Sequence, residues 1–336
     1  DMLDVRVSAP PEDGRANDFR TLLNIRFLSS VLFLAAFGYI FLLNKNSRYP
    51  SEWAVKNGIR SIVSYTLPAV LLFVLYSAFF QEISDYWDQL ERSSVIAIKH
   101  EEGFTEKIWN PYLPHFQAIW LLSYTLFFLT LLAVANMRLF KNKLLAAVNL
   151  VGLVIVIFAF ITGGFYELSE LRSLYVRPRQ PAFFQPDVSG IVVRYISLAF
   201  LAAALMACGR YVKEYFAQPP FKIGFDLLLH LSVLIAASTE MAGWMDMAHS
   251  AQSNKLALSI LWGVYALLLI VLGIRARKKH LRIAAIGLFG ITLLKLFFYD
   301  LAHLDTISKT IVFVSLGLLL LGISFLYNKY KGAMEE

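Results

Sequence analysis

Nine apolar stretches of roughly 20 residues dominate this chain of 336 residues. Each is long enough, at about 1.5 Å per helical residue, to cross the ~30 Å hydrocarbon core of a bilayer. The sequence is 58% hydrophobic and 16% charged, which excludes a water-soluble globule, because such proteins are about 45–50% apolar and about 25% charged. We therefore expect an all-α integral membrane protein with spans at 22–43, 59–80, 116–137, 144–165, 191–209, 223–240, 256–274, 283–299 and 308–327.

The segments between these spans differ sharply in charge. Alternate segments carry 17 Lys/Arg and 4 Asp/Glu, and the opposite face carries 13 and 19 when the intramembrane Asp226 and Lys295 are set aside. Because basic loops stay in the cytoplasm, this pattern predicts an outer amino terminus and a cytoplasmic carboxyl terminus. The net charge of +7 then reflects topology and does not indicate a nucleic-acid partner. The basic segments are 44–60, 138–143, 210–222, 275–282 and 328–336.

A recurring pattern of charges suggests an internal repeat. Even-numbered spans reach the outer face at an acid, the four acids being Glu82, Glu167, Glu240 and Asp300. Odd-numbered spans begin there with a base, the five bases being Arg26, His115, Arg194, Lys255 and Lys309. The pattern predicts four parallel helical hairpins and a ninth helix, with acid-to-base contacts linking neighbouring hairpins. The predicted parts are an outer segment 1–21, a transmembrane domain 22–327 made of hairpins 22–90, 116–175, 191–247 and 256–305 and a helix 308–327, and a cytoplasmic tail 328–336.

Two further features bound the function. Cys208 is the single cysteine, so neither an intrachain disulfide nor a thiolate metal cluster is expected. The opening residues Asp1 to Asp4 lack the basic, apolar and cleavage regions of a signal peptide. They suggest a piece of a longer protein.

The last third of the chain resembles a known family. Trp262-Gly263-Val264-Tyr265, the Lys295 to Asp300 spacing, and the closing run from Leu316 to Tyr327 match the bacterial predicted membrane proteins called domain of unknown function 2339 in order and spacing. The resemblance is most specific for residues 256–330. It implies a multi-pass protein of the bacterial inner membrane and brings no reaction with it.

Ionisable residues inside apolar spans are rare and often functional. Asp226 and His230 lie four residues apart on one helix face. Either they form a proton relay or cation site, or Asp226 lies beside Lys222 among the headgroups while His230 bonds a neighbouring helix; the structural alternative is favoured. For Lys295, structural pairing is likewise favoured over a substrate role.

Two outer loops contain candidate contacts. Loop 166–190 carries three arginines among aromatic residues and prolines, which suits either phosphate or headgroup recognition or, more commonly, a solvated loop. They are Arg172, Arg177 and Arg179. Loop 81–114 is expected to form a short interfacial helix followed by a turn.

No enzyme motif is present in the sequence, and no cofactor or metal site is indicated, since His249 and His303 are better explained as surface histidines. The favoured function is transport or handling of an envelope lipid, glycan or small solute at an outer-face cleft between repeats. A membrane scaffold with protein partners is the alternative, and an envelope glycosyl- or phospholipid-transferase ranks third.

Overall fold

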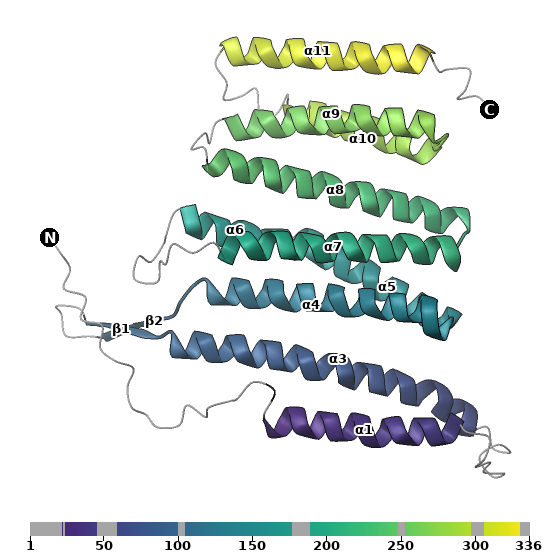
Figure 1. The fold of residues 1–336 in the computed structure, drawn as a ribbon. Coiled ribbons are helices and arrows are strands. Elements are labelled where there is room, and N and C mark those ends of the chain that lie inside the picture. The colour runs from purple at the N-terminus through teal and green to yellow at the C-terminus, as the bar shows by residue number, and fades with distance from the viewer. Residues whose placement is uncertain are drawn as a thin grey trace. The chain divides into compact units, whose positions relative to one another are not determined.

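The computed structural model describes residues 22, 24–45, 59–99, 105–176, 189–247, 253–296 and 306–329. Helices account for nearly all of them (Figure 1). The elements are α1 (Ile25–Lys45), α3 (Ile59–Ser93), β1 (Ile96–Lys99), β2 (Thr105–Ile108), α4 (Leu113–Ala135), η1 (Asn136–Phe140), α5 (Lys143–Ala159), η2 (Phe160–Gly164), α6 (Phe165–Val176), α7 (Ser189–Glu214), α8 (Pro219–Met247), α9 (Ser253–Arg275), α10 (Lys279–Lys295) and α11 (Thr306–Lys329).

Seven helical segments in the described part of the chain are long and apolar enough to cross a membrane. They coincide with the first seven predicted spans, and α5, η2 and α6 together form one of them, Lys143–Ser173. The next predicted span corresponds to α10, which has 17 residues. The expectation of a helical multi-pass architecture is therefore confirmed, while the count of nine spans stays a prediction.

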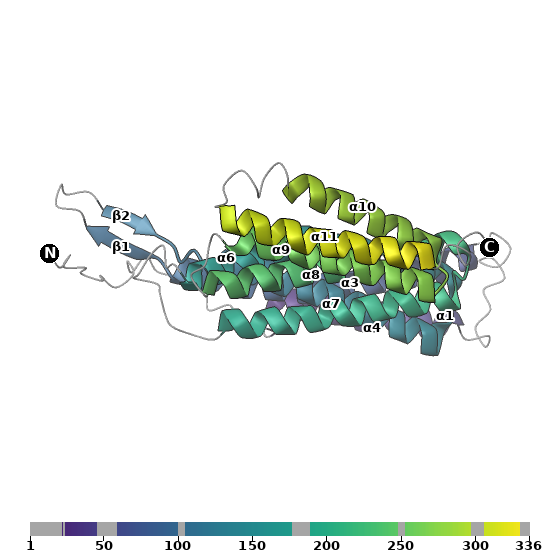
Figure 2. The same cartoon turned by 90° about the horizontal axis from the view of Figure 1, so that it is seen from above.

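The chain divides into two compact units, of which the first contains residues 1–128 and 180–185. In this unit α1 packs against α3, which continues through Pro68 as a helix of 35 residues. At about 1.5 Å per residue α3 is about 52 Å long, more than the hydrocarbon core requires. An antiparallel hairpin of β1 and β2 follows its carboxyl end, with Ile96 opposite Ile108 (Figure 2).

The expectation of a separate interfacial helix within 81–114 was wrong, whereas the chain does turn at Pro111 and Tyr112 as expected. Helix α3 instead continues to Ser93, and its last turns pack on α4: the Trp87 ring stacks on Phe116, and the Gln117 amide donates to the Asp88 carboxylate at 2.7 Å. The residues beyond form two paired strands, in which the β-branched Ile96, Ile98, Thr105 and Ile108 favour the extended conformation.

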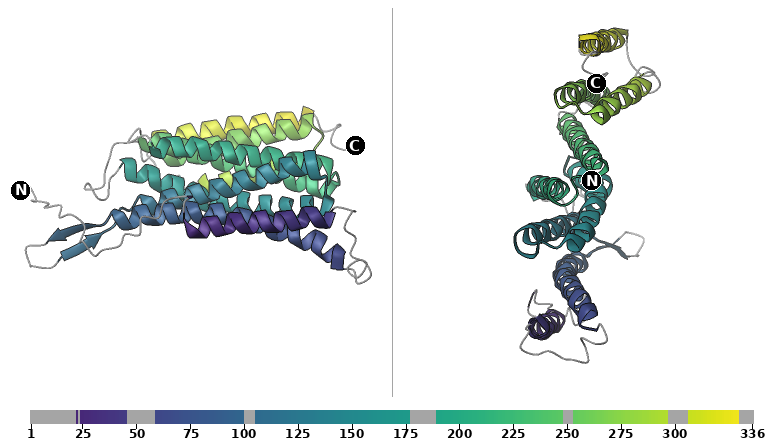
Figure 3. Two further views of the ribbon diagram at one scale, coloured as in Figure 1. Left: turned by 60° about the horizontal axis from the view of Figure 1, so that its bottom comes forward. Right: turned by 90° about the vertical axis from the view of Figure 1, so that its right-hand side faces the viewer.

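The second unit contains residues 129–179 and 186–336. Its helices are viewed nearly end-on in the right panel of Figure 3. Helix α5 packs on α7, α6 contacts both α7 and α8, and α9 contacts α8, α10 and α11. A buried amide joins the first pair: Asn149 donates to the carbonyl of Leu129 at 3.1 Å and to the Tyr211 hydroxyl at 3.2 Å. Such interhelical bonds add to van der Waals packing between helices in a bilayer, where there is no hydrophobic driving force for association.

The α9–α10 hairpin is closed by backbone geometry. Arg277 adopts a left-handed conformation with φ of 52°, and the Lys278 amide donates to the carbonyl of Gly273 at 2.8 Å. Gly273 also allows α10 to lie close to α9, because a Cβ at Gly273 would come within 2.7 Å of the Arg282 side chain. The tight turn fixes where the basic side chains of residues 277–280 lie.

Candidate functional site

Arg194 and Glu240 form an ion pair between α7 and α8. The Arg194 Nε donates to the Glu240 carboxylate, and the two side chains are 8% and 29% exposed. The terminal nitrogens Nη1 and Nη2 of Arg194 are buried and have no hydrogen-bond partner among the described residues. Leaving buried donors without acceptors costs about 1–3 kcal/mol, more for a charged group. The arginine therefore has donors available for a ligand.

Arg172 of α6 lies across α8 beside this pair. Its Nη1 donates to the carbonyl of Thr239 at 3.1 Å, its Nη2 donates to the Ser169 hydroxyl at 3.2 Å, and Nη2 lies 3.6 Å from the Asp246 carboxylate. Gly243 makes this position available, since a Cβ there would come within 2.0 Å of Nη1. The two arginines are thus fixed by α6, α7 and α8 together.

A cavity of about 70 Å³ lies between these three helices and is lined by Arg172, Arg194 and Glu240. Its volume accommodates several water molecules or one small anionic group, and excludes a whole lipid. The remaining wall is mainly apolar, and four of its side chains are exposed on the protein surface: Ile191, Tyr195, Trp244 and Met247. A small charged group attached to an apolar body matches this arrangement.

The sequence-predicted charges of α7 and α8 are thus brought together, but inside one predicted hairpin rather than between neighbours. In the first unit, Glu82 is buried and accepts from the Leu22 backbone amide at 2.8 Å and the Asn24 side chain at 2.6 Å. Arg26 lies 3.8 Å from Asp85.

The other predicted charges are spread over several elements. Glu167 lies in the first turn of α6, Lys309 lies in α11, and Lys255 belongs to α9, although its side chain is outside the described part. Asp300, Arg177 and Arg179 are outside the described residues.

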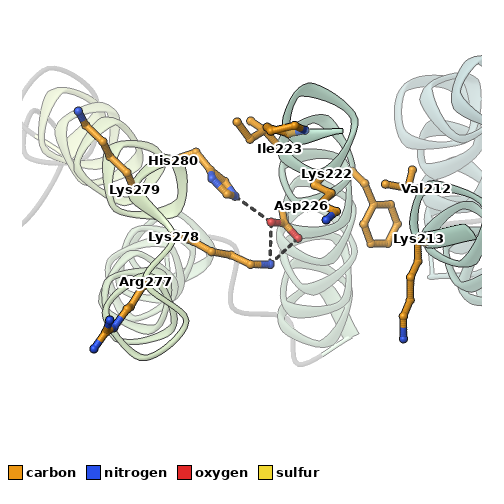
Figure 4. Close-up of a pocket in the computed structure, with 12 residues that line it drawn as sticks. Val212, Lys213, Lys222, Ile223, Asp226, Arg277, Lys278, Lys279 and His280 are labelled. Carbon is orange, nitrogen blue, oxygen red and sulfur yellow. Dashed lines mark hydrogen bonds and ion pairs between the residues drawn. The ribbon is translucent and has the colours of Figure 1, made fainter. Parts of the chain in front are cut away.

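Asp226 and His230, the predicted intramembrane pair, bind different partners. Asp226 accepts from Lys278 Nζ at 2.7 and 2.9 Å and lies 2.8 Å from His280 Nε2 (Figure 4). The His230 Nδ1 instead lies 3.0 Å from the Tyr265 hydroxyl. The partners of both residues come from the next hairpin, and no spacing in the sequence points to them.

Lys295 reaches back to α9. Its Nζ donates to the Ser259 hydroxyl at 2.7 Å and lies 6.0 Å from the centroid of the Trp262 ring. These contacts hold the lysine by a hydroxyl and an aromatic face, as a structural role requires.

In the part of the chain that the structure describes, no three His, Cys, Asp or Glu side chains are placed to hold a metal ion. His249 and His303 lie outside that part.

Comparison with known proteins identifies one similarity. Residues 15–330 match the model of a family described as "Predicted membrane protein (DUF2339)". No curated protein and no solved structure matches the chain. The match extends far upstream of the segment whose residues resemble the family most closely.

Proposed function

Because this chain belongs to the DUF2339 family of predicted membrane proteins, we propose that it binds and handles a membrane amphiphile through the cavity between α6, α7 and α8. The amphiphile's small anionic group, a phosphate or carboxylate, would accept from Arg194, while its apolar part would lie along the exposed Tyr195 and Trp244. Lipid-linked sugars and anionic envelope lipids have this chemistry.

One observation carries the proposal: the two terminal nitrogens of Arg194 are buried in the wall of a cavity without a partner among the described residues. A guanidinium binds a phosphate or carboxylate through two parallel hydrogen bonds. Of the three guanidinium nitrogens of Arg194, Nε is the one that donates to Glu240. Nη1 and Nη2 are therefore available to such a ligand.

The cavity also fits the proposed repeat architecture. In the arrangement of nine spans and four parallel hairpins, α6 ends the second hairpin and α7 and α8 form the third, so the site lies between repeats. The positive-inside pattern supports a position for this cavity at the outer boundary of a bacterial inner membrane. The surrounding bilayer is the expected partner, and other membrane proteins are a further expectation.

The test is native mass spectrometry of the full-length protein extracted gently from its own membranes, comparing the native chain with Arg194→Lys. Lysine keeps a positive charge for Glu240 but lacks the two-pronged face. We expect a stoichiometric amphiphile on the native chain and its loss from the variant. Arg26→Lys is the matched control. It makes the same substitution in an exposed ion pair, in which Arg26 lies 3.8 Å from Asp85, and we expect it to retain the ligand.

Two results would overturn the proposal. The first is a native chain that carries no small molecule, and a co-purifying membrane protein would then favour the scaffold. The second is equal ligand occupancy in the native chain and in Arg194→Lys.

A further inference from the structure

A second cavity, of about 480 Å³, lies toward the amino-terminal end of α8. Asp226 in its wall precedes Glu240 by 14 positions on the same helix, a separation of about 21 Å. The end of α7, the start of α8 and the α9–α10 turn form the wall. This cavity is therefore distinct from the one that Arg194 lines.

The wall of this cavity is strongly basic. Five Lys or Arg side chains line it against the single carboxylate of Asp226: Lys213, Lys222, Arg277, Lys278 and Lys279. Lys278 and His280 already occupy both oxygens of that carboxylate (Figure 4). The negative charge in the wall is thus fully used by two partners.

Four cations of the wall have no carboxylate partner among the residues that the structure describes. Lys213, Lys222, Arg277 and Lys279 are exposed, and within the described ranges none of them forms a hydrogen bond or ion pair through its side chain. In Figure 4 the side chains of Lys213, Arg277 and Lys279 point away from Asp226. A cavity with this charge attracts an anion.

An apolar groove of about 380 Å³ adjoins the basic cavity. The two share Val212 and Phe225, and the groove continues along Leu228 and Leu231 of α8 and past Val154 of α5. The Phe225 ring can lie in the shared wall because α7 has Gly209 there; a Cβ at that position would come within 2.7 Å of the ring. Basic and apolar surfaces thus meet at one aromatic side chain.

We propose that the basic cavity and the apolar groove together bind one phospholipid with a net negative headgroup, taken from the surrounding bilayer. The phosphate lies in the cavity that Lys213, Lys222, Arg277 and Lys279 line and is attracted by their charge, and one acyl chain lies along Leu228 and Leu231. Basic pockets between membrane helices bind anionic headgroups by this complementarity. A soluble phosphate compound shares the headgroup chemistry but leaves the apolar groove empty.

Two variants of the full chain in detergent test the two halves of the site. Lys222→Gln with Lys279→Gln removes charge from the cavity, and Arg138→Gln with Lys143→Gln is its control, because Lys279 and Lys143 each begin a helix and all four residues are exposed. Gly224→Leu fills the groove, since a Cβ there meets nothing within 4 Å. Gly287→Leu, equally unobstructed, is its control.

Native mass spectrometry with added phosphatidylglycerol, phosphatidylcholine or inorganic phosphate provides the measurement. We expect one tightly bound phosphatidylglycerol, with affinity lowered about fivefold for each cavity lysine removed, since one such charge near an anionic lipid is worth about 1 kcal/mol. Gly224→Leu also weakens binding, and both controls leave it unchanged.

Three results would overturn the proposal. Equal binding of phosphatidylcholine shows that the headgroup charge is not recognised. Equal weakening by the controls shows a general charge or packing effect. Displacement of the lipid by inorganic phosphate, with no effect of Gly224→Leu, assigns the cavity to a soluble anion. Arg194 is unchanged in all four variants, so the outer-face proposal can fail or hold independently.

Discussion

The guanidinium of Arg172 lies directly over Gly243, in the space that a Cβ on that residue of α8 would fill. The contact fixes the spacing of α6 and α8 at the candidate site. It also makes Gly243 the position where the smallest possible substitution has a large expected effect.

Gly243→Ala is expected to displace Arg172 and break its bonds to the Thr239 carbonyl and Ser169 hydroxyl. Leaving a partly buried guanidinium without these acceptors lowers the free energy of unfolding by about 1–3 kcal/mol. Thermal unfolding in detergent measures the loss. Gly287→Ala, where a Cβ meets nothing within 4 Å, is the control and should not destabilise; equal effects of the two alanines would show that Arg172 is not held by this contact.

Asp226 and Lys278 are expected to be energetically coupled, because both carboxylate oxygens accept from the same Nζ. A double-mutant cycle of Asp226→Asn and Lys278→Gln should give about 1 kcal/mol, a modest value since the Lys278 side chain is 41% exposed. The cycle with Lys279→Gln in place of Lys278→Gln should give a value near zero. Similar coupling in both cycles would mean that the turn's overall charge, rather than this pair, stabilises the hairpin.

Glu82→Ala is expected to loosen the beginning of α1. The buried carboxylate accepts from the Leu22 amide and from Asn24, whose own Oδ1 accepts from the Phe27 amide at 2.7 Å. Hydrogen exchange at the first turn of α1 should become faster, while Glu91→Ala leaves it unchanged. Unaltered exchange in Glu82→Ala would show that α1 begins there without help from α3.

The proposed orientation can be read from cysteine labelling, because Cys208 is the sole cysteine in the sequence and is 1% exposed. In a Cys208→Ala background, Met247→Cys is expected to react with an impermeant maleimide added to spheroplasts. Ala276→Cys, in the basic α9–α10 turn, should react only after permeabilisation. The opposite pattern would invert the topology and place Arg194 on the cytoplasmic side.

Hydropathy located the spans well, but it does not encode how each helix is rotated about its axis. All faces of a spanning helix are apolar, so the sequence does not tell which face meets protein and which meets lipid. This explains why the sequence indicates Arg194 and Glu240 as candidate charges but predicts that each pairs with a neighbouring hairpin, whereas the two pair with each other. It also explains why Lys278 and Tyr265 were missed as the partners of Asp226 and His230.

The strands β1 and β2 were missed for a different reason. Each has only four residues, and β2, with the sequence Thr-Glu-Lys-Ile, shows no apolar-polar alternation that would predict a strand. The continuation of α3 depends on contacts with Phe116 and Gln117 of α4, which lie about 30 residues further along the chain.

The two hydrogen-bond acceptors of the buried Asn149 amide are synthesised at different times. Its two acceptors, the Leu129 carbonyl and the Tyr211 hydroxyl, are 20 residues before it and 62 residues after it. At about 5–20 residues per second of synthesis, about 3–12 s pass before Tyr211 is made. Because Leu129 is made before Asn149, its carbonyl is available to the amide throughout that interval, and the Tyr211 hydroxyl becomes available only when α7 has been made.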